Sequence, residues 1–269
     1  MRDSVIAPVL DTRSSVRVTF AVWEALFLRE AIGRVSGGRV AWLWLLLEPV
    51  AQLALLLAVI SAIRGRTASG YEYAPFLAIG VLAYNLFKNT ALRSMAAISA
   101  NKALFTYRQV KPVDVVLVRA CLEGVIQILV SIVLLIGMSL AGFDSIPHDP
   151  LQAFVVVILL WVFGMGLGLI LAVGDTLVAE LGRLARLAFV PLYFLSGIFF
   201  SLAMLPPGLR EWMLLNPVVH GLEALREAFL LHYRLVEGVT VGYLAAFAFA
   251  SFFLGLALQI RFANRLVMQ

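Results

Sequence analysis

Long apolar runs separated by short polar connections recur along the whole chain. A hydrocarbon core of about 30 Å takes about 20 helical residues to cross. Runs of sufficient length lie near 41–63, 74–95, 115–141, 151–173, 186–205 and 240–261. The pattern therefore predicts an all-α membrane protein with six transmembrane helices.

The stretch from Phe189 to Leu231 departs from this pattern. Pro206-Pro207 ends the fifth run, and two short amphipathic pieces follow, joined at Asn216-Pro217. Each piece is too short to cross a membrane and too apolar for a solvated loop. Backbone at membrane depth must be buried in protein or line a water-filled cavity. We expect a re-entrant helix pair at about 206–231, between spans five and six and beside a transport pathway.

The N-terminal segment, residues 1–40, carries a separate helical pattern. Trp23 and Phe27 fall four residues apart among charged positions that include Arg29 and Glu30. Aromatic anchors combined with charged positions are typical of an amphipathic helix in the membrane interface. The prediction is a cytoplasmic interface helix, serving either as a passive anchor or as a docking site, followed by a transmembrane domain over 41–269.

Composition and charge agree with a membrane protein. Hydrophobic residues make up 62% and charged residues 14% of the chain, whereas soluble domains carry about 25% charged residues. The net charge of +5 could suggest nucleic acid, but the basic residues flank the apolar runs. Lys and Arg collect on cytoplasmic flanks, and their distribution places both termini in the cytoplasm.

The motifs of common catalytic and cofactor sites are missing from the sequence. It contains no Gly-x-x-x-x-Gly-Lys-Ser/Thr phosphate loop, so ATP cannot bind by that mechanism. The three histidines are scattered, which disfavours a metal site. We therefore predict no catalytic residues, no metal and no cofactor, and an intramembrane enzyme is disfavoured.

Two carboxylates lie within or near apolar runs, where charge is costly and often functional. For Glu123, the simplest partner is Arg119, four residues earlier on the same helix. Glu48 could pair with Arg39 or Arg119, or contact the headgroup of a substrate. Structural pairing is the favoured interpretation for both carboxylates.

Three glycines in the fourth run, Gly164, Gly166 and Gly168, permit close helix contact. The contact could be a dimer seam or packing within the chain. On the second short piece, Glu223 and Arg226 are spaced for an ion pair. A polar rim at the exit of the pathway is the alternative interpretation.

Three local patterns resemble the permease subunit of ABC-2-type exporters, specifically the capsular polysaccharide export permeases. The first is Glu24-Ala-Leu-Phe-Leu-Arg-Glu30 followed by Trp42-Leu-Trp44-Leu-Leu-Leu-Glu48-Pro49. The second runs from Asn101-Lys-Ala-Leu-Phe105 to Val110-Lys-Pro112, and the third is Asn216-Pro217 followed by Glu223-Ala-Leu-Arg226. Their order and spacing cover nearly the whole chain.

The resemblance implies a homodimer in the bacterial inner membrane that exports lipid-linked polysaccharide. A separate ATPase dimer would supply the energy, and a periplasmic adaptor and an outer-membrane channel would continue the route. The alternative within the fold is another cargo: O-antigen, teichoic acid, a lipid or a drug. A channel without an ATPase is an alternative from another class.

The resemblance also assigns roles to residues. The connection between spans two and three would dock on the ATPase through Asn101, Lys102, Leu104, Phe105, Tyr107 and Arg108, although a solvated turn is the alternative. Sugar rings lie flat against aromatic rings, so a polysaccharide pathway suits aromatic side chains. The candidate pathway residues are Glu48, Tyr84, Trp161, Tyr193 and Phe194, and the candidate exit residues are Asn216, Pro217, Glu223 and Arg226.

Overall fold

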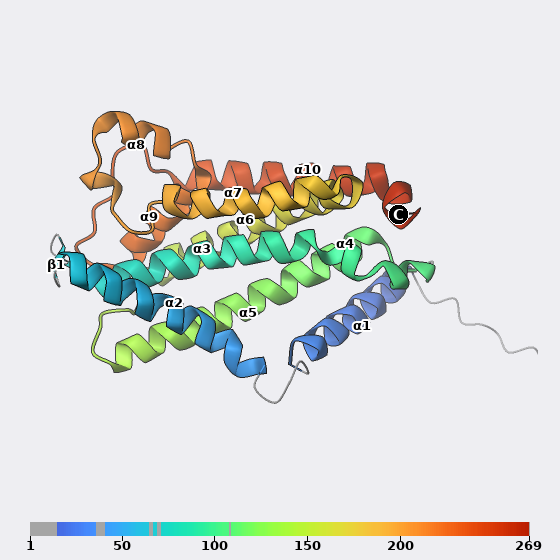
Figure 1. Cartoon of the computed structure of the whole chain (residues 1–269), viewed down its shortest axis with the longest axis horizontal. Coiled ribbons are helices and arrows are strands. Elements are labelled where there is room, and N and C mark those ends of the chain that lie inside the picture. The colour runs from blue at the N-terminus through green and yellow to red at the C-terminus, as the bar shows by residue number, and fades with distance from the viewer. Residues whose placement is uncertain (1–14, 36–40, 65–66, 69–70, 108, 269) are drawn as a thin grey trace, which may run out of the picture.

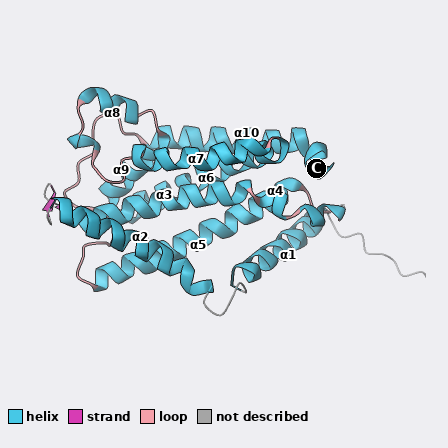
Figure 2. Cartoon of the chain, viewed as in Figure 1, coloured by secondary structure: helices cyan, strands magenta, loops and turns pink. Residues whose placement is uncertain are grey.

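The structure is a computed structural model, and it describes residues 15–35, 41–64, 67–68, 71–107 and 109–268. Helices account for nearly all of these residues (Figures 1 and 2). The α-helices are α1 (Ser15–Val35), α2 (Ala41–Arg64), α3 (Tyr73–Met95), α4 (Ala97–Ala100), α5 (Pro112–Leu140), α6 (Pro150–Leu177), α7 (Ala179–Leu195), α8 (Pro207–Met213), α9 (Pro217–Phe229) and α10 (Val241–Met268). There are also two 3-10 helices, η1 (Lys102–Thr106) and η2 (Leu202–Met204). Two short strands pair with each other, β1 (Thr67–Ala68) and β2 (Tyr71–Glu72).

The helix α6 lies at the centre of the bundle and contacts α3, α5, α7, α9 and α10. Figure 1 shows the long helices running roughly side by side, with α8 and α9 at one end and α1 near the other. The main core is apolar and includes the fully buried Phe76, Leu77, Leu160 and Leu222. The fold is therefore that of an all-α membrane protein built around one central helix.

The glycines of α6 pack within the chain. A Cβ added to Gly166 would lie 2.5 Å from the Phe252 backbone nitrogen on α10. A Cβ on Gly164 would lie 2.7 Å from the Phe87 carbonyl oxygen on α3. Backbones this close leave no room for a side chain. The three-glycine pattern thus serves packing inside one subunit, which was the alternative to a dimer seam.

Three described helices are long and apolar enough to cross a membrane: Pro112–Leu140, Pro150–Leu177 and Val241–Met268. They correspond to the third, fourth and sixth predicted spans. A shorter apolar helix at Leu43–Val59 lies within α2, over the first predicted span, and α3 covers the second.

The fifth predicted span is displaced in the structure. We predicted 186–205, but α7 begins at Ala179 and ends at Leu195. Gly197 has a φ of +71°, a left-handed conformation that favours glycine, and it turns the chain before Pro206 is reached. At the start, Val178 alone separates α6 from α7, so Arg183 and Arg186 lie on the helix and not in a connection.

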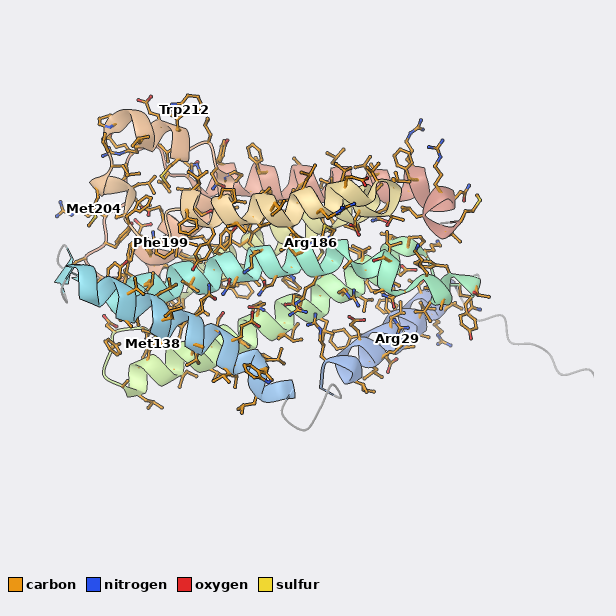
Figure 3. All side chains as sticks on the ribbon, in the orientation of Figure 1. Arg29, Met138, Arg186, Phe199, Met204 and Trp212 are labelled. Atoms are coloured by element: carbon orange, nitrogen blue, oxygen red, sulfur yellow. The ribbon has the colours of Figure 1, made fainter. Side chains whose placement is uncertain are left out.

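The two short helices predicted after this span are present, and they differ in burial. Asn216 caps α9, because its side-chain oxygen accepts a hydrogen bond from the Val218 amide at 3.0 Å, and Pro217 occupies the first helical position. The helix α9 packs against α3, α6 and α10. In contrast, α8 exposes Trp212, which Figure 3 shows at the outer edge of this end of the molecule.

Candidate functional site: a polar seam between α2, α3 and α7

Polar side chains from three apolar helices meet in a row that we name the polar seam: Glu48 and Gln52 on α2, Asn85 and Lys88 on α3, and Tyr193 on α7. Asn85 Nδ2 donates to Gln52 Oε1 at 3.0 Å. Gln52 Nε2 donates to the Tyr193 hydroxyl at 3.2 Å. Spacings of four residues on α2 and three on α3 place each pair on one helix face. Glu48 is near enough to Lys88 to act on its charge.

The polar seam is unusual because most of its neighbours on α2, α3 and α7 are apolar. Asn85 is 5% exposed, and its side-chain oxygen has no hydrogen-bond partner among the described residues. An unpaired polar atom in an apolar interior costs about 1–3 kcal/mol. Polar groups retained at such a cost within a membrane protein mark substrate pathways more often than packing.

Aromatic rings continue from the polar seam toward the end of the bundle that carries α8. The Tyr193 ring meets Phe199 at 5.4 Å, and Phe194 stacks on Phe199 at 5.5 Å. Figure 3 shows Phe199 near this end. Phe194 is 56% exposed, so one ring of the group is open to a ligand. Of the predicted pathway residues, Glu48 and Tyr193 thus belong to the polar seam, and Phe194 contacts the seam through the Tyr193 ring at 5.7 Å.

Two other predicted pathway residues are used for packing in this conformation. Tyr84 is fully buried and donates its hydroxyl proton to the Phe189 carbonyl at 2.6 Å. Trp161 donates its indole N–H to the Ala120 carbonyl at 3.0 Å, which joins α6 to α5. The structure therefore places Trp161 away from the polar seam, while Tyr84 contacts the seam through the Tyr193 ring at 5.1 Å.

Sequence reasoning missed Gln52, Asn85 and Lys88. Each is a polar residue inside a predicted apolar span, and that position alone could have marked it as a candidate. What identifies them is pairing across helices that lie far apart in sequence.

Glu123 has different partners from the one predicted. Its carboxylate lies 2.7 Å from Arg34 Nη2 and 3.1 Å from Arg93 Nε, and it is 2% exposed. Arg119, the predicted partner, instead pairs with Glu30 at 2.6 Å. The prediction was wrong because it considered only neighbours on the same helix, whereas α1 and α3 bring guanidinium groups from distant segments. The pairing of Arg119 also removes it as a partner for Glu48, and Arg39 lies outside the described residues.

The helix α1 is held against the bundle by polar contacts. Trp23 Nε1 donates to Asp114 Oδ1 at 2.9 Å, and Arg29 hydrogen-bonds to Asn101. Phe27 packs against a second apolar cluster, which includes Ile98, Val116 and Leu169. Figure 3 shows Arg29 on α1, at the end of the bundle away from α8. The predicted interface residues Trp23, Phe27, Arg29 and Glu30 therefore contact protein, and the apolar residues of α1 are not confined to one face.

Burial lowers the pKa of the Arg34 guanidinium, and the Glu123 carboxylate opposes this effect. An arginine remains charged at physiological pH in either case. The guanidinium group of Arg34 therefore stays positively charged across the physiological range.

The connection between α3 and α5 contains the predicted ATPase-docking residues. It forms the short helix η1, as expected, and Tyr107 after it is 66% exposed. Leu104 and Phe105 instead pack against the second apolar cluster, and Asn101 is 5% exposed. Lys102 is exposed, and Arg108 lies outside the described residues.

A cleft of about 570 Å³ lies between this connection and the end of α10. Phe105 and Val110 line one side, and Ile260 and Val267 line the other. The connection therefore presents an exposed ring, Tyr107, and a cleft whose lining includes both apolar and polar side chains.

The exit residues form a buried network. Glu223 and Arg226, both fully buried, lie 3.0 Å apart, so the predicted ion pair is present. Arg226 Nη2 also donates to the Ile198 carbonyl at 2.8 Å, and the Tyr233 hydroxyl lies 2.7 Å from Glu223 Oε2. In this conformation the pair joins α9 to the turn after α7 and does not form a solvated rim.

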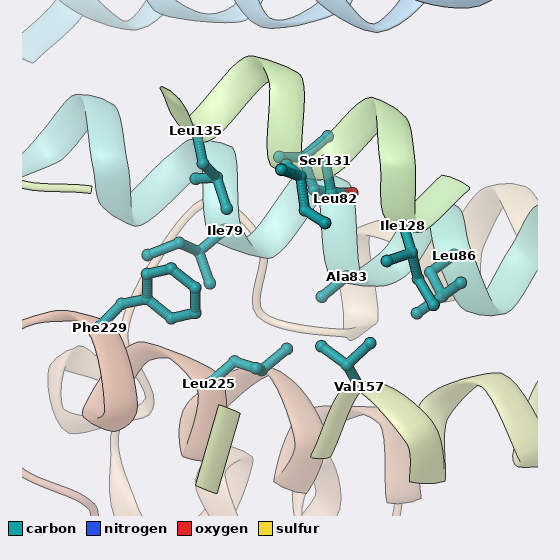
Figure 4. Close-up of a pocket in the computed structure, with 11 residues that line it drawn as sticks. Ile79, Leu82, Ala83, Leu86, Ile128, Ser131, Leu135, Val157, Leu225 and Phe229 are labelled. Carbon is teal, nitrogen blue, oxygen red and sulfur yellow. The ribbon is translucent and has the colours of Figure 1, made fainter. Parts of the chain in front are cut away.

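An apolar pocket of about 130 Å³ lies between α3, α5, α6 and α9, lined by Ile79, Leu135 and Phe229 among others (Figure 4). Ser131 supplies one of its few polar atoms. Among the described residues no group of three or more His, Cys, Asp or Glu could hold a metal ion.

An all-α membrane protein with a polar seam through its apolar helices has the features of a membrane transport protein. A family model described as "ABC-2 type transporter" matches residues 22–230, and the chain belongs to this family. As a membrane permease of this kind, it works with a partner ATPase.

Three curated relatives illustrate the family. The chain is 38% identical over 246 residues to the polysialic acid transport protein KpsM of Escherichia coli, covering 91% of this chain and 95% of that protein. It is 28% identical over 216 residues to the capsule polysaccharide export inner-membrane protein CtrC of Neisseria meningitidis serogroup B, covering 80% and 81%. It is 26% identical over 253 residues to the capsule polysaccharide export inner-membrane protein BexB of Haemophilus influenzae, covering 94% and 95%.

Proposed function

We propose that the chain is the permease subunit of an ABC-2 exporter that moves lipid-linked capsular polysaccharide across the inner membrane. One observation carries the proposal. Relatives from three organisms, all named for capsule polysaccharide export or polysialic acid transport, match at least 80% of the chain. The chain is a multi-pass inner-membrane protein whose role is transport.

The proposed topology has six membrane-spanning helices: α2, α3, α5, α6, α7 and α10. The length and hydropathy of α5, α6 and α10 support it, and the Lys and Arg distribution places both termini in the cytoplasm. Residues 1–40 then form a cytoplasmic segment, in which α1 lies at the interface while held to the bundle. The pair α8–α9 lies on the outer side as a re-entrant element within the domain 41–269.

ATP hydrolysis takes place on a separate ATPase subunit in this proposal. The connection that contains η1 lies on the cytoplasmic side and docks on that subunit. Tyr107 is the exposed aromatic residue of this connection, whereas Phe105 is partly buried in the apolar cluster. A substitution at Phe105 would therefore disturb packing as well as docking, and Tyr107 is the better probe.

Tyr107→Ala is expected to weaken binding of the ATPase to the permease by about thirtyfold, since aromatic residues often dominate an interface and cost about 2 kcal/mol when truncated. Pull-down of the ATPase from solubilised membranes measures the effect. Gln109→Ala, at another exposed position nearby, serves as the control. Normal ATPase recovery with Tyr107→Ala would contradict docking at this connection.

The pathway itself is proposed to form between two copies of the chain, with the polar seam as part of its wall. The helix α7 exposes Leu184, Leu187 and Val190, a face that is open to lipid or to a second copy. Polar seam groups offer hydrogen bonds to sugar hydroxyls, and Phe194 offers a flat ring to their C–H faces. A periplasmic adaptor and an outer-membrane channel complete the proposed route.

Phe194→Ala is expected to lower polysaccharide export by about three- to tenfold, because an aromatic contact contributes about 0.5–1.5 kcal/mol. Phe253→Ala is the matched control, since Phe253 is 63% exposed on α10 and Phe194 is 56% exposed on α7. Cell-surface polysaccharide per molecule of permease gives the measurement. Equal export by both variants would remove Phe194 from the pathway.

The function as a whole can be tested by complementation. A capsule-producing strain that lacks its own permease gene should accumulate polysaccharide inside the cell and regain surface capsule when this chain is expressed with its ATPase. Polysaccharide that remains inside the cell, although the chain is present in the membrane, would indicate a different cargo.

A further inference from the structure

Three basic side chains gather where α1, α3 and α5 meet, and we name them the cationic cluster: Arg34, Lys88 and Arg93. Arg34 and Arg93 share the Glu123 carboxylate, at 2.7 Å and 3.1 Å. Arg93 acts on the charge of both Arg34 and Lys88, so the three cations belong to one electrostatic group. The side chain of Arg93 is 42% exposed and that of Arg34 is 17% exposed.

The cationic cluster carries more positive charge than its surroundings neutralise. Glu123 is a single carboxylate bonded to two guanidinium groups. Lys88 is half-buried, and no carboxylate of the described residues lies within ion-pair distance of it, although Glu48 is near. Glu30 and Arg119, which pair with each other, also act on Arg34, so in all four cations face three carboxylates. Like charges this close repel one another, and an added anion would relieve the repulsion.

The depth of the cationic cluster indicates the kind of anion. Arg93 lies in the last turn of α3, and Lys88 precedes it by five residues, which is about 7.5 Å along a helix. In the proposed topology this end of α3 lies at the cytoplasmic surface. Arg93 is then at headgroup level, with Lys88 just inside the hydrocarbon boundary, from which a lysine can reach the headgroups.

We propose that Arg34, Lys88 and Arg93 bind the phosphate group of a lipid headgroup at the cytoplasmic face. The inference rests on the topology of the proposed function, and it assigns a ligand chemistry to the cytoplasmic end of the polar seam. A guanidinium group matches phosphate oxygens in two parallel hydrogen bonds, and a lysine adds a mobile point charge. The phosphate belongs either to a membrane phospholipid or to the lipid anchor of the substrate.

The test uses the full transporter in phosphatidylcholine nanodiscs, with photoactivatable phosphatidylglycerol or photoactivatable phosphatidylcholine as the probe. Mass spectrometry should locate phosphatidylglycerol labelling on α3 around Lys88 and Arg93, in preference to phosphatidylcholine. Lys88→Gln and Arg93→Gln should each reduce this preference by about fivefold, since one basic residue near an anionic surface contributes about 1 kcal/mol. Lys88→Arg should retain it.

Arg183→Gln is the matched control, because it removes one exposed basic residue of α7 without touching the cationic cluster. Equal labelling by the two probes, or an unchanged preference in both Gln variants, would overturn the proposal. The Arg93 side chain is 42% exposed, so Arg93→Gln remains informative even if Lys88→Gln fails to fold.

Competition distinguishes the two sources of phosphate. Displacement of the label by isolated capsule glycolipid, but not by the same polysaccharide without its lipid, assigns the site to the substrate anchor. Labelling that neither the glycolipid nor the lipid-free polysaccharide displaces assigns the site to a membrane phospholipid. The assay does not measure export, so a failed complementation with intact phosphatidylglycerol preference would reject the proposed function and leave the site in place.

Discussion

Replacing Arg226 by alanine is expected to destabilise the protein by about 3–5 kcal/mol, because it leaves the Glu223 carboxylate buried without its counter-charge. Both side chains are fully buried, and Arg226 also satisfies the Ile198 carbonyl at 2.8 Å. Thermal unfolding of the purified protein in detergent measures the effect. Only a small fraction of the variant should reach the membrane in folded form.

The chain provides a matched control for this experiment. Glu180 and Arg183 on α7 have the same three-residue spacing and a similar distance, 3.1 Å, but their side chains are 67% and 69% exposed. Surface ion pairs contribute about 0–1 kcal/mol, so Arg183→Ala should leave unfolding almost unchanged. Similar losses for Arg226→Ala and Arg183→Ala would show that burial of the Glu223–Arg226 pair is not what stabilises this end of the bundle.

Gly166→Ala is expected to cost about 3 kcal/mol through overpacking at the contact of α6 with α10. The added Cβ would lie 2.5 Å from the Phe252 nitrogen and 2.7 Å from the Ser251 carbonyl carbon. Both are backbone atoms, which cannot rotate away, so the two helices must separate. Thermal unfolding and the yield of monodisperse protein report the change.

Gly137→Ala on α5 is the control, because nothing lies within 4 Å of the Cβ it would add. Alanine is favoured over glycine inside a helix by up to about 1 kcal/mol, so this variant should be as stable as the original or slightly more stable. A Gly166→Ala protein with unchanged stability would contradict the close backbone contact between α6 and α10.

Hydropathy predicted the helices well where apolar residues are continuous. The long helices α5, α6 and α10 have such continuous apolar runs. Their predicted ranges lie within the observed helices except for one residue each, Ala141 after α5 and Thr240 before α10. It failed at α7, because Glu180, Arg183 and Arg186 lower the hydropathy of its first turns while leaving their helix propensity high. Hydropathy also extended the predicted fifth span beyond Leu195, since an apolar stretch does not reveal the left-handed turn at Gly197.

The candidate site was less predictable because its contacts join distant parts of the chain. Glu48 and Tyr193 were identified one at a time, whereas in the folded chain Gln52 on α2 hydrogen-bonds to both Asn85 on α3 and Tyr193 on α7. Arg119 was chosen for Glu123 from helical spacing, and the folded chain supplies Arg34 and Arg93 in its place. Spacing along one helix suggests a possible partner, but the packing of distant segments decides which residues actually pair.

The most direct test of the account is transport by purified components. The chain and its ATPase would be reconstituted in liposomes with their cytoplasmic side outward, and radiolabelled lipid-linked capsular polysaccharide would be added outside with ATP. We predict ATP-dependent accumulation of label inside the vesicles, reduced by Phe194→Ala and not by Phe253→Ala. Vigorous ATP hydrolysis without any accumulation of the polysaccharide would contradict the proposal that this chain exports capsule.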